Sequence, residues 1–508
     1  MTKSTHQTLK LALILTLSVL LQGCSGIQHP SEDHATKHIG LPAQFSEVQL
    51  GSASSVDIAD GWLASFNDPI LESLVQEAWD HNPDLYIAAS RYQEAAASLR
   101  FAASYLYPEL NGGAGARYQY NDGDSDTDRY TGSLDVSWEL DLWGRLRSDR
   151  AFARSVTEAS GLEYLQARHS IAAAVAQGYY GVISARSQLA INQQLYDAER
   201  FTAETTLQRV DAGLGTSLDA DLAESSIRLA EAAVQDNLAS IRESQRGIEL
   251  LLGRYPSAEI DTASEVLPTI DGGAFAVGVP TALIERRPDI RGAERRVDAA
   301  FYDVESAKAA KLPQLTLSAD ATAMLDPAEL VSSIAADLFA PILQGGRLDA
   351  QEEAANARQH QAIGNFASVA LQAFREVESA LSNSKALEKR EILLDDASKR
   401  LQRASDSAIS RYDQGLMTIL DLQQIRRQDF ETRSLLLAVR YEQVVQRLNL
   451  YLALGGPVVG NQPTDGSKPT QLEEQDVNEM MNNELHVGIQ HTENERSGTD
   501  SETQHGDE

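Results

Sequence analysis

The chain has 508 residues, a formal net charge of −31 and a mean hydropathy of −0.31. Because so acidic a protein would repel nucleic-acid phosphates, this charge excludes nucleic acid as a partner. After the first 24 residues no stretch is apolar for long enough to form a transmembrane helix, which excludes a bundle of membrane helices.

Residues 1–23 are predicted to be a lipoprotein signal peptide. Two lysines accompany an apolar run from Leu11 to Leu21, which is too short to span a bilayer as a helix. The segment ends at Gly23 and Cys24, a pair that resembles the lipobox of bacterial lipoproteins. We therefore expect Cys24 to begin the mature chain, to carry a covalent lipid and to start an N-terminal linker over residues 24–60.

A first β-hairpin is predicted over about residues 107–143, inside a first repeat that covers residues 61–255. Its second strand alternates strictly between two faces, whereas the partner strand, from about Leu110 to Tyr120, has a weaker pattern. The apolar face comprises Leu134, Val136, Trp138, Leu140 and Leu142, and the opposite face comprises Ser133, Asp135, Ser137, Glu139 and Asp141.

This alternation is typical of an outer-membrane barrel, and a soluble β-sandwich has the same pattern. The lipid signal, together with tyrosines and tryptophans near the strand ends, favours the membrane, where aromatic girdles form at the interfaces. On that interpretation Asp135, Glu139 and Asp141 would face a water-filled lumen.

A very long helix is predicted over about residues 145–212, with a return helix over about residues 217–252. No proline occurs between Pro108 and Pro256. One helix of this size would measure about 100 Å, at roughly 1.5 Å per residue. Such a helix needs packed neighbours, because a narrow apolar stripe does not stabilise it alone.

The two helices are joined by a turn with recognisable caps. Gly213 occupies the position of a left-handed C-terminal cap, and Thr216 occupies the N-cap position of the return helix. Asp219 follows three residues later, where an acidic side chain completes a capping box. The sequence therefore predicts a helical hairpin.

The same unit recurs after a linker over residues 256–286. The segment 82–85 (Asn-Pro-Asp-Leu) returns 205 residues later as 287–290 (Arg-Pro-Asp-Ile), and the capped turn returns 202 residues later as Gly415, Thr418 and Asp421. These constant offsets indicate an internal duplication. The second repeat covers residues 287–456, with a hairpin over about 313–343, a long helix over about 347–413 and a return helix over about 419–454. Its weaker strand is expected from about Ser333 to Leu343.

The C-terminal segment, residues 457–508, differs from both repeats. It contains twelve acidic residues against Lys468 and Arg496, a net charge of −10. With many polar and few aromatic residues, it is predicted to be disordered.

The expected fold is mainly α with a membrane β-barrel, built from a duplicated helix, β-hairpin, long helix and helix unit. Four strands do not close a barrel, and lipid does not tolerate open sheet edges. Two chains would supply eight strands, whose interior is usually filled by side chains. Three chains would supply twelve strands around a lumen, and their long and return helices would form a twelve-helix tube.

The chain resembles the outer membrane factors, the TolC-like lipoprotein channels of tripartite efflux pumps. The resemblance covers about residues 61–456 and rests on four segments. They are Trp62-x-x-x-Phe66-x-Asp68-Pro69, Asn82-Pro83-Asp84-Leu85, Trp138 to Arg147, and Arg286-Arg287-Pro288-Asp289-Ile290. The resemblance implies a homotrimer anchored to outer-membrane lipid, with an α-helical tunnel in the periplasm. It also implies a periplasmic adaptor and an inner-membrane pump of the resistance-nodulation-division type, with the channel itself passive.

The same resemblance assigns roles to the turns. The Gly-x-x-Thr turns of the family dock the adaptor, a role that falls on Gly213, Thr216, Gly415 and Thr418. An acidic residue after the second turn constricts the closed periplasmic mouth. That position is Asp421, and Asp219 is its counterpart in the first repeat. Gln424 stands where some relatives have an arginine that pairs across the constriction, while Arg426 and Arg427 lie nearby.

Two other functions remain open from the sequence: an outer-membrane channel for type I protein secretion, and a non-porous, lipid-anchored trimeric coiled-coil scaffold. An enzyme is not expected, since no catalytic or metal-binding constellation occurs. Most histidines lie in the signal or the ends of the chain. The acidic loop between Asp122 and Asp128 lacks the glycine and the final glutamate of a calcium loop. We therefore predict no metal and no cofactor apart from the lipid on Cys24.

Overall fold

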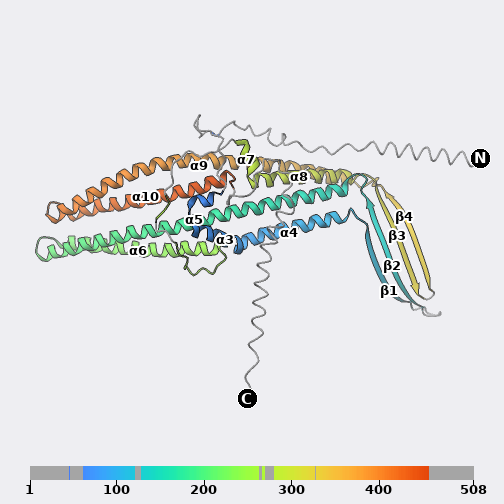
Figure 1. The fold of residues 1–508 in the computed structure, drawn as a ribbon, viewed down its shortest axis with the longest axis horizontal. Helices are drawn as coiled ribbons and strands as arrows, with labels where there is room; N and C mark the ends of the chain where they lie inside the picture. The colour runs from blue at the N-terminus through green and yellow to red at the C-terminus, as the bar shows by residue number, and fades with distance from the viewer. Residues whose placement is uncertain are drawn as a thin grey trace, which may run out of the picture.

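The computed structural model describes residues 45, 61–119, 127–262, 266–268, 280–325 and 328–456. Long helices lie side by side along the molecule, and a β-sheet occupies one end (Figure 1). The two helical hairpin turns lie at the opposite end (Figure 1). No helix within the described residues combines the length and the apolar content that a membrane span requires.

Each half of the chain contributes the same series of elements. The first half contains η2 (Trp62–Phe66), α3 (Pro69–His81), α4 (Pro83–Ser104), β1 (Glu109–Gln119), β2 (Thr127–Leu140), α5 (Arg145–Asp211) and α6 (Ser217–Leu251). The second half contains α7 (Pro280–Arg286), α8 (Pro288–Ala309), β3 (Gln314–Leu325), β4 (Glu329–Phe339), α9 (Arg347–Asp413) and α10 (Ile419–Ala453). The helices α5 and α9 have 67 residues each, as the proline-free segments suggested.

The four strands form one antiparallel sheet in the order β1-β2-β3-β4. The pairing places Asp135 opposite Asn111 on one side and opposite Asp320 on the other. Side chains of β2 alternate across the sheet, so the polar face predicted for this strand continues onto its neighbours. The outer edges of β1 and β4 have no strand beside them within the described residues.

The last strand does not lie where the sequence placed it. β4 spans Glu329–Phe339, four residues earlier than the expected segment from Ser333 to Leu343. Every residue of β4 is exposed. Its sequence therefore has no alternation of buried and exposed positions from which the strand register could be predicted. Pro341, which has no N–H to donate to a ladder, lies after the strand rather than within it.

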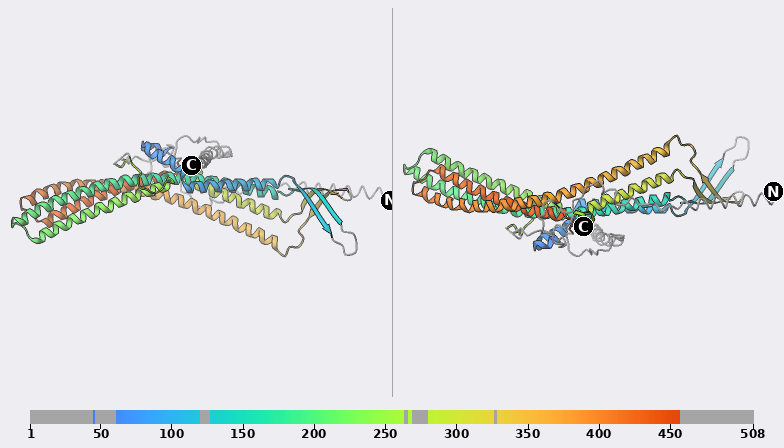
Figure 2. Two further views of the ribbon diagram at one scale, coloured as in Figure 1. Left: turned by 90° about the horizontal axis from the view of Figure 1, so that it is seen from below. Right: turned by 90° about the horizontal axis from the view of Figure 1, so that it is seen from above.

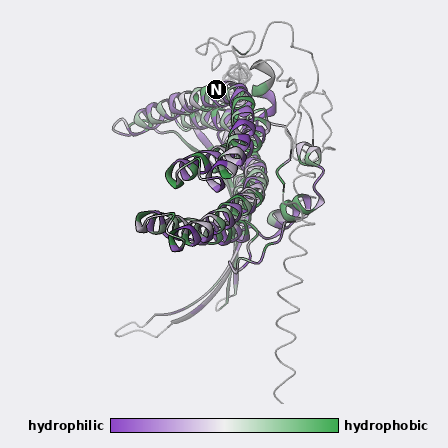
Figure 3. Ribbon diagram, turned by 90° about the vertical axis from the view of Figure 1, so that its left-hand side faces the viewer, coloured by the Kyte–Doolittle hydropathy of each residue, from purple (hydrophilic) through white to green (hydrophobic). Residues whose placement is uncertain are grey.

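The helices form an open layer instead of a closed bundle. In the half near the sheet, α4 packs on α5, α5 on α8, and α8 on α9. Figure 2 shows α8 and α9 spread beside α4 and α5 in this half. In the half near the turns, α6 packs on α5, α5 on α10, and α10 on α9. Seen end-on in Figure 3, the helices follow an arc.

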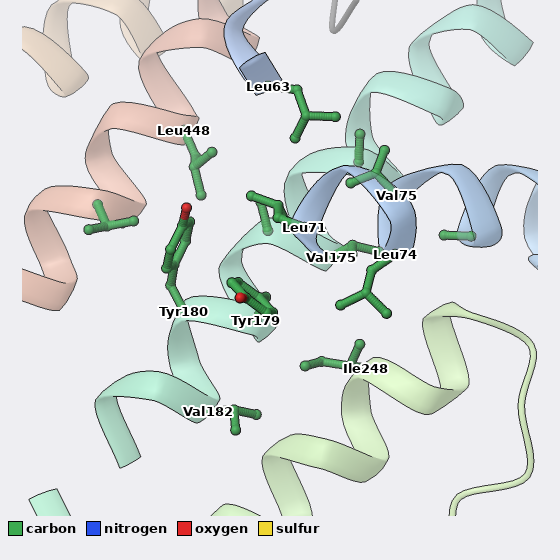
Figure 4. Packing of buried hydrophobic residues seen from close by; sticks show 14 of the residues in the cluster. Leu63, Leu71, Leu74, Val75, Val175, Tyr179, Tyr180, Val182, Ile248 and Leu448 are labelled. Atoms are coloured by element: carbon green, nitrogen blue, oxygen red, sulfur yellow. The ribbon is translucent and has the colours of Figure 1, made fainter. Parts of the chain in front are cut away.

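A core in the middle of the molecule holds the N-terminal elements onto this layer. Trp62 of η2 is fully buried and stacks on Tyr451 of α10, with ring centroids 5.8 Å apart. Figure 4 shows Leu71 and Leu74 of α3 close to Tyr179 of α5. Burial of each such side chain contributes about 1.5–3 kcal/mol. The core therefore fixes α3 against the centre of α5.

The duplicated Pro-Asp motifs serve one purpose in both repeats. The side-chain amide of Asn82 donates to the Leu251 carbonyl at 2.8 Å, near the end of α6. Arg287, 205 residues later, donates to the Ala453 carbonyl at 3.1 Å, at the end of α10. Each residue thus ties the start of a shorter helix to the end of a return helix. Arg287 is 5% exposed and also binds Asp289 and Glu376, at 2.7 and 2.8 Å.

Glycines make these junctions compact. Gly253 follows α6 with φ +69°, and a Cβ atom there would lie 2.3 Å from the His81 carbonyl oxygen. Gly455 follows α10 with φ +67°, and a Cβ atom there would lie 3.2 Å from the backbone of Arg286. At Gly253 only glycine allows both the left-handed conformation and the close approach of α3.

Candidate functional site

The two helical turns have nearly identical backbones. Gly213 and Gly415 both have φ +74°. In each turn the next leucine donates its N–H back to a carbonyl in the last turn of the helix, from Leu214 to Arg209 and from Leu416 to Arg411, both at 2.8 Å. These bonds are those of a Schellman cap, which satisfies the free carbonyls at a helix C-terminus.

The N-caps of the return helices differ in one bond. In the first turn the Asp219 N–H donates to Thr216 Oγ1 at 3.3 Å, and the Thr216 N–H donates to Asp219 Oδ2 at 2.9 Å, a full capping box. The hydrogen bonds from Thr216 hold the pKa of Asp219 below its usual value. In both turns the threonine hydroxyl also donates to the aspartate, from Thr216 to Asp219 at 2.8 Å and from Thr418 to Asp421 at 2.7 Å. In the second turn the Asp421 N–H donates to Thr418 Oγ1 at 3.2 Å, and the capping box is not completed by a bond from the Thr418 N–H.

Both turns present apolar side chains to their surroundings. The exposed leucines are Leu214, Leu218, Leu416 and Leu420, each more than half accessible. Because hydrogen bonds within each turn satisfy its backbone groups, the exposed leucine side chains are the groups that these tips offer for apolar contact. Clustered apolar side chains at the end of a long helical hairpin are suited to contact another protein.

A cross-hairpin contact joins the two tips. Arg209 of α5 donates from Nη1 to the Tyr412 carbonyl at 2.9 Å, and its guanidinium lies 5.1 Å from the Tyr412 ring centroid. The hydroxyls of Thr206 and Tyr412 lie 2.7 Å apart. Sequence reasoning missed this contact. The buried tyrosine just before the Gly415 turn was the available signal, but its partners lie more than 200 residues away.

A second cross-hairpin contact lies farther from the tips. Arg426 of α10 is 3% exposed, and its Nη1 donates to the Ala198 carbonyl at 2.7 Å and to the Thr202 hydroxyl. Glu199 of α5 is 6% exposed, and its Oε2 has no hydrogen-bond partner within the described chain. Burial raises the pKa of Glu199, although Arg426 opposes this shift.

The candidate gate residues and their neighbours differ in whether their side chains are buried or exposed. Arg426 points towards α5 and is committed to Ala198 and Thr202. Asp421, Gln424 and Arg427 are exposed. Of the two nearby arginines, Arg427 is therefore the one whose side chain is available to other groups near the tip.

The raised pKa of Glu199 gives a testable pH dependence. Because the folded protein binds this proton more tightly than the unfolded chain, its stability falls as pH rises from the usual glutamate range through the raised value. We expect Glu199→Gln to remove this loss and to raise the melting temperature at pH 7 by about 2 °C. Circular dichroism at pH 5 and pH 7 measures the effect.

The control for this prediction is Glu204→Gln, an exposed glutamate one turn farther along α5. It should leave the pH dependence unchanged. An equal drop in melting temperature between pH 5 and pH 7 in Glu199→Gln and in the parent protein would contradict the assignment.

The predicted lumen residues have distinct surroundings in the structure. Asp135 lies on the polar face of the sheet, beside Asp320 of β3. Glu139 pairs with Arg145 at 2.7 Å. Asp141 lies just beyond β2, and its carboxylate accepts the N–H groups of Leu146 and Arg147, which caps the start of α5. Asp320 is therefore a further acidic residue of this face that sequence reasoning did not single out.

Several expectations fall outside the described residues, among them Cys24, the signal and linker, the acidic loop between Asp122 and Asp126, and the C-terminal tail. Within the described residues no group of three or more His, Cys, Asp or Glu side chains is arranged to hold a metal ion.

Comparison with known families decides what kind of protein has this arrangement. A family model described as "Outer membrane efflux protein" matches residues 74–254 and 279–456, one segment in each repeat. The chain belongs to the outer membrane efflux protein family. This efflux protein is thus a protein of the outer membrane, and its family consists of channels rather than enzymes.

Two curated relatives match the efflux protein over most of their length. The pyoverdine export outer membrane protein OpmQ of Pseudomonas aeruginosa is 28% identical over 462 residues, covering 87% of this chain and 96% of OpmQ. The cation efflux system protein CusC of Escherichia coli is 28% identical over 465 residues, covering 87% of this chain and 97% of CusC.

Solved structures show the same architecture. The outer-membrane channel OprN superposes with a TM-score of 0.77 at 25% identity, covering 85% of this efflux protein and 99% of OprN. A crystal structure of CusC gives a TM-score of 0.72 at 25% identity, with the same coverage. The match extends over nearly the whole of both channels and includes both repeats.

Proposed function

We propose that the protein is the outer-membrane exit duct of a tripartite efflux pump and works as a homotrimer. The observation that carries this proposal is the open layer with two unlike edges. One edge consists of β1, α4 and α6, and the other consists of β4 and α9. A layer with unlike edges closes into a ring by head-to-tail association of identical chains.

The exposed side chains support closure at these edges. On α4, Tyr86 is 69% exposed, and on α9, Leu393 is 70% exposed. On β4, Ile334 is 89% exposed. Three chains would supply twelve strands, enough to enclose water, and joined strands leave no open edge in lipid. The helices would continue the tube into the periplasm as a twelve-helix barrel.

The tips would be the periplasmic entrance. Gly213, Thr216, Gly415 and Thr418 give the turns their shape, and the leucines beside them would receive the helical hairpins of a periplasmic adaptor. The adaptor would connect the channel to an inner-membrane pump of the resistance-nodulation-division type. A non-porous scaffold would have no need of a four-stranded sheet with open edges.

The N-terminus would add a lipid anchor. We propose that residues 1–23 are removed and that Cys24 carries the lipid, consistent with the relative from Salmonella typhimurium named "Probable outer membrane lipoprotein SilC". Cargo would be small molecules, because relatives are named for pyoverdine export and for cation efflux. The channel would pass them without using energy.

Reconstitution in a planar bilayer tests the proposal. Purified trimer should give discrete conductance steps, with Asp135, Asp320 and Glu139 lining the strand part of the pore. A monomer that produces no steps at any voltage would refute the exit-duct function. The same recordings give the baseline for the gate variants.

Asp421→Ala is expected to raise the conductance of the closed channel. In a trimer three Asp421 carboxylates would meet at the entrance, so their removal should widen it and weaken its preference for cations. The hydrogen bond from the Thr418 hydroxyl to the Asp421 carboxylate is also lost, whereas the bond from the backbone N–H of residue 421 to Thr418 Oγ1 remains. Single-channel recording measures the change.

Thr418→Ala is the matched control, because it removes the same hydrogen bond and keeps the carboxylate. It should leave the closed-state conductance near that of the parent. An equal conductance increase in both variants would assign the effect to loss of that hydrogen bond and remove Asp421 from the gate.

A further inference from the structure

The two repeats are equivalent residue by residue. Adding 205 to the bounds of α4 gives those of α8, and adding 202 to the bounds of α5 and α6 gives those of α9 and α10. The strand pair Glu109 and Ser137, moved by 205 and 202, becomes Gln314 and Phe339, which are paired in the second hairpin. A contact between the two repeats can therefore be translated, position by position, to the outer edges of the layer.

One contact between the repeats lies where α8 packs on α5. A Cβ atom added to Gly292 of α8 would lie 3.7 Å from the Cβ atom of Leu162, which is 2% exposed. The counterparts of this pair are Ile87 of α4 and Gly364 of α9, on the two opposite edges of the layer (Figure 1). Leucine against glycine within the chain thus corresponds to glycine and isoleucine at its edges.

Both edge residues are exposed. Ile87 is 48% exposed, and no described atom lies within 4 Å of a Cβ atom added to Gly364. Glycine inside a helix is destabilising relative to alanine, and Gly364 lies within the 67 residues of α9. An exposed glycine in a long helix, with an exposed isoleucine at the matching position of the other edge, indicates that another helix approaches α9 closely there.

We propose that α9 packs on α4 of a second copy of the chain in the way that α5 packs on α8, an inference that rests on the proposed exit duct. Ile87 of the partner subunit then fills the space beside Gly364. The glycine allows the two helices to approach, and the isoleucine supplies the volume that Leu162 supplies within the chain.

The sheet fits the same arrangement. Gly132 of β2 pairs with Ala323 of β3, and the translated pair is Ile334 of β4 and the partner's Tyr118 in β1. Ile334 is 89% exposed and Tyr118 is 64% exposed in the single chain. A β-branched side chain directly opposite an aromatic one is a favourable cross-strand pair. The translated register also joins the apolar face of β4 to the apolar face of β1.

Opposite charges meet where the translation is applied nearer the tips. Arg426 of α10 donates to the Ala198 carbonyl of α5 at 2.7 Å. The counterpart of Arg426 is Glu224 of α6, which is exposed, and the counterpart of Ala198 is Arg400 of α9, whose side chain is 68% exposed. Glu224 of the partner subunit would therefore lie beside Arg400, where the two charges attract.

Two carboxylates also meet in this region. Translation of another contact between α5 and α10 places the partner's Glu231 near Asp396. Each carboxylate has an arginine of its own, since Arg228 pairs with Glu231 at 2.9 Å and Arg400 pairs with Asp396 at 2.8 Å. Their charges are therefore balanced within each chain before the two copies meet.

Disulfide trapping in the full-length protein in its membrane tests the proposal. In Ile87→Cys, Gly364→Cys the two Cβ atoms should lie near the 3.7 Å of the equivalent contact within the chain, inside the range of a disulfide. Oxidation should yield a covalent trimer about tenfold faster than in the control Ile87→Cys, Leu371→Cys. Leu371 is 55% exposed and lies two turns from Gly364 on the same side of α9.

The outcomes separate this contact from the exit duct. Equal linking in both variants, or linking in neither, would overturn the contact and leave the exit duct standing if native mass spectrometry shows a trimer and bilayers show conductance steps. A monomer that gives no conductance steps would overturn both.

Charge reversal tests the tip end of the same contact. Glu224→Arg and Arg400→Glu should each lower the temperature at which the trimer dissociates in detergent, and the double variant should regain much of the loss. A double variant that dissociates at or below the temperature of the weaker single variant would overturn the pairing of these two residues.

Discussion

The Gly253→Ala variant is expected to lose about 3–5 kcal/mol of stability, the largest effect that we predict for a single methyl group. The added Cβ would lie 2.3 Å from the His81 carbonyl oxygen, which is backbone and does not move aside as a flexible side chain would. The left-handed φ of +69° adds about 1–2 kcal/mol of strain. The end of α3 must therefore separate from the end of α6.

Thermal unfolding followed by the helical circular dichroism signal measures this loss. Gly213→Ala is the matched control, because Gly213 has a φ of +74° and no atom within 4 Å of an added Cβ. It should lose only the backbone strain, about 1–2 kcal/mol. Equal destabilisation in the two variants would show that the contact with His81 contributes nothing.

The Arg209→Ala variant is expected to shift the channel strongly towards its open state. Arg209 links the first hairpin to the second through the Tyr412 carbonyl and ring. This prediction follows from the proposed exit duct, on the proposal that its entrance opens by separation of the two hairpins. A hydrogen bond from a charged group contributes about 1.5–3 kcal/mol. Its loss corresponds to a change of about tenfold to a hundredfold in the equilibrium between closed and open channels.

Planar-bilayer recordings of the open probability measure this shift. Arg411→Ala is the control, because Arg411 is the counterpart of Arg209 in the second repeat and its side chain is exposed. It should leave the open probability unchanged. If Arg209→Ala and Arg411→Ala had the same open probability as the parent, the Arg209 contact would not hold the entrance closed.

Local patterns in the sequence were sufficient for much of the fold. The absence of proline and the capped ends located α5 and α9, since helix geometry depends on residues within a few positions of one another. Glycine and threonine at fixed spacing located both hairpin turns, because each cap forms within one short segment. The repeat offset then connected the two halves.

The sequence predicted strand positions less accurately where the residues do not alternate between buried and exposed faces. β2 contains the alternating residues from Ser133 to Leu140 and ends before Asp141 and Leu142, which the sequence had placed on its two faces, whereas the fully exposed β4 lies four residues from its expected position. In β4 the pairing with β3 sets the register, for example Ala319 opposite Ile334. That pairing depends on the sheet as a whole and not on the strand's own residues.

The sequence by itself determined the duplication, the long helices, the capped turns and the alternating faces of β2, because each depends on residues that are neighbours in the chain or on repetition along it. Only the tertiary structure decided which side chains join the two hairpins. Arg209 meets Tyr412, and Arg426 meets Thr202, across more than 200 residues. Such contacts depend on how two rigid helices are placed side by side, which is set by the packing of the whole layer.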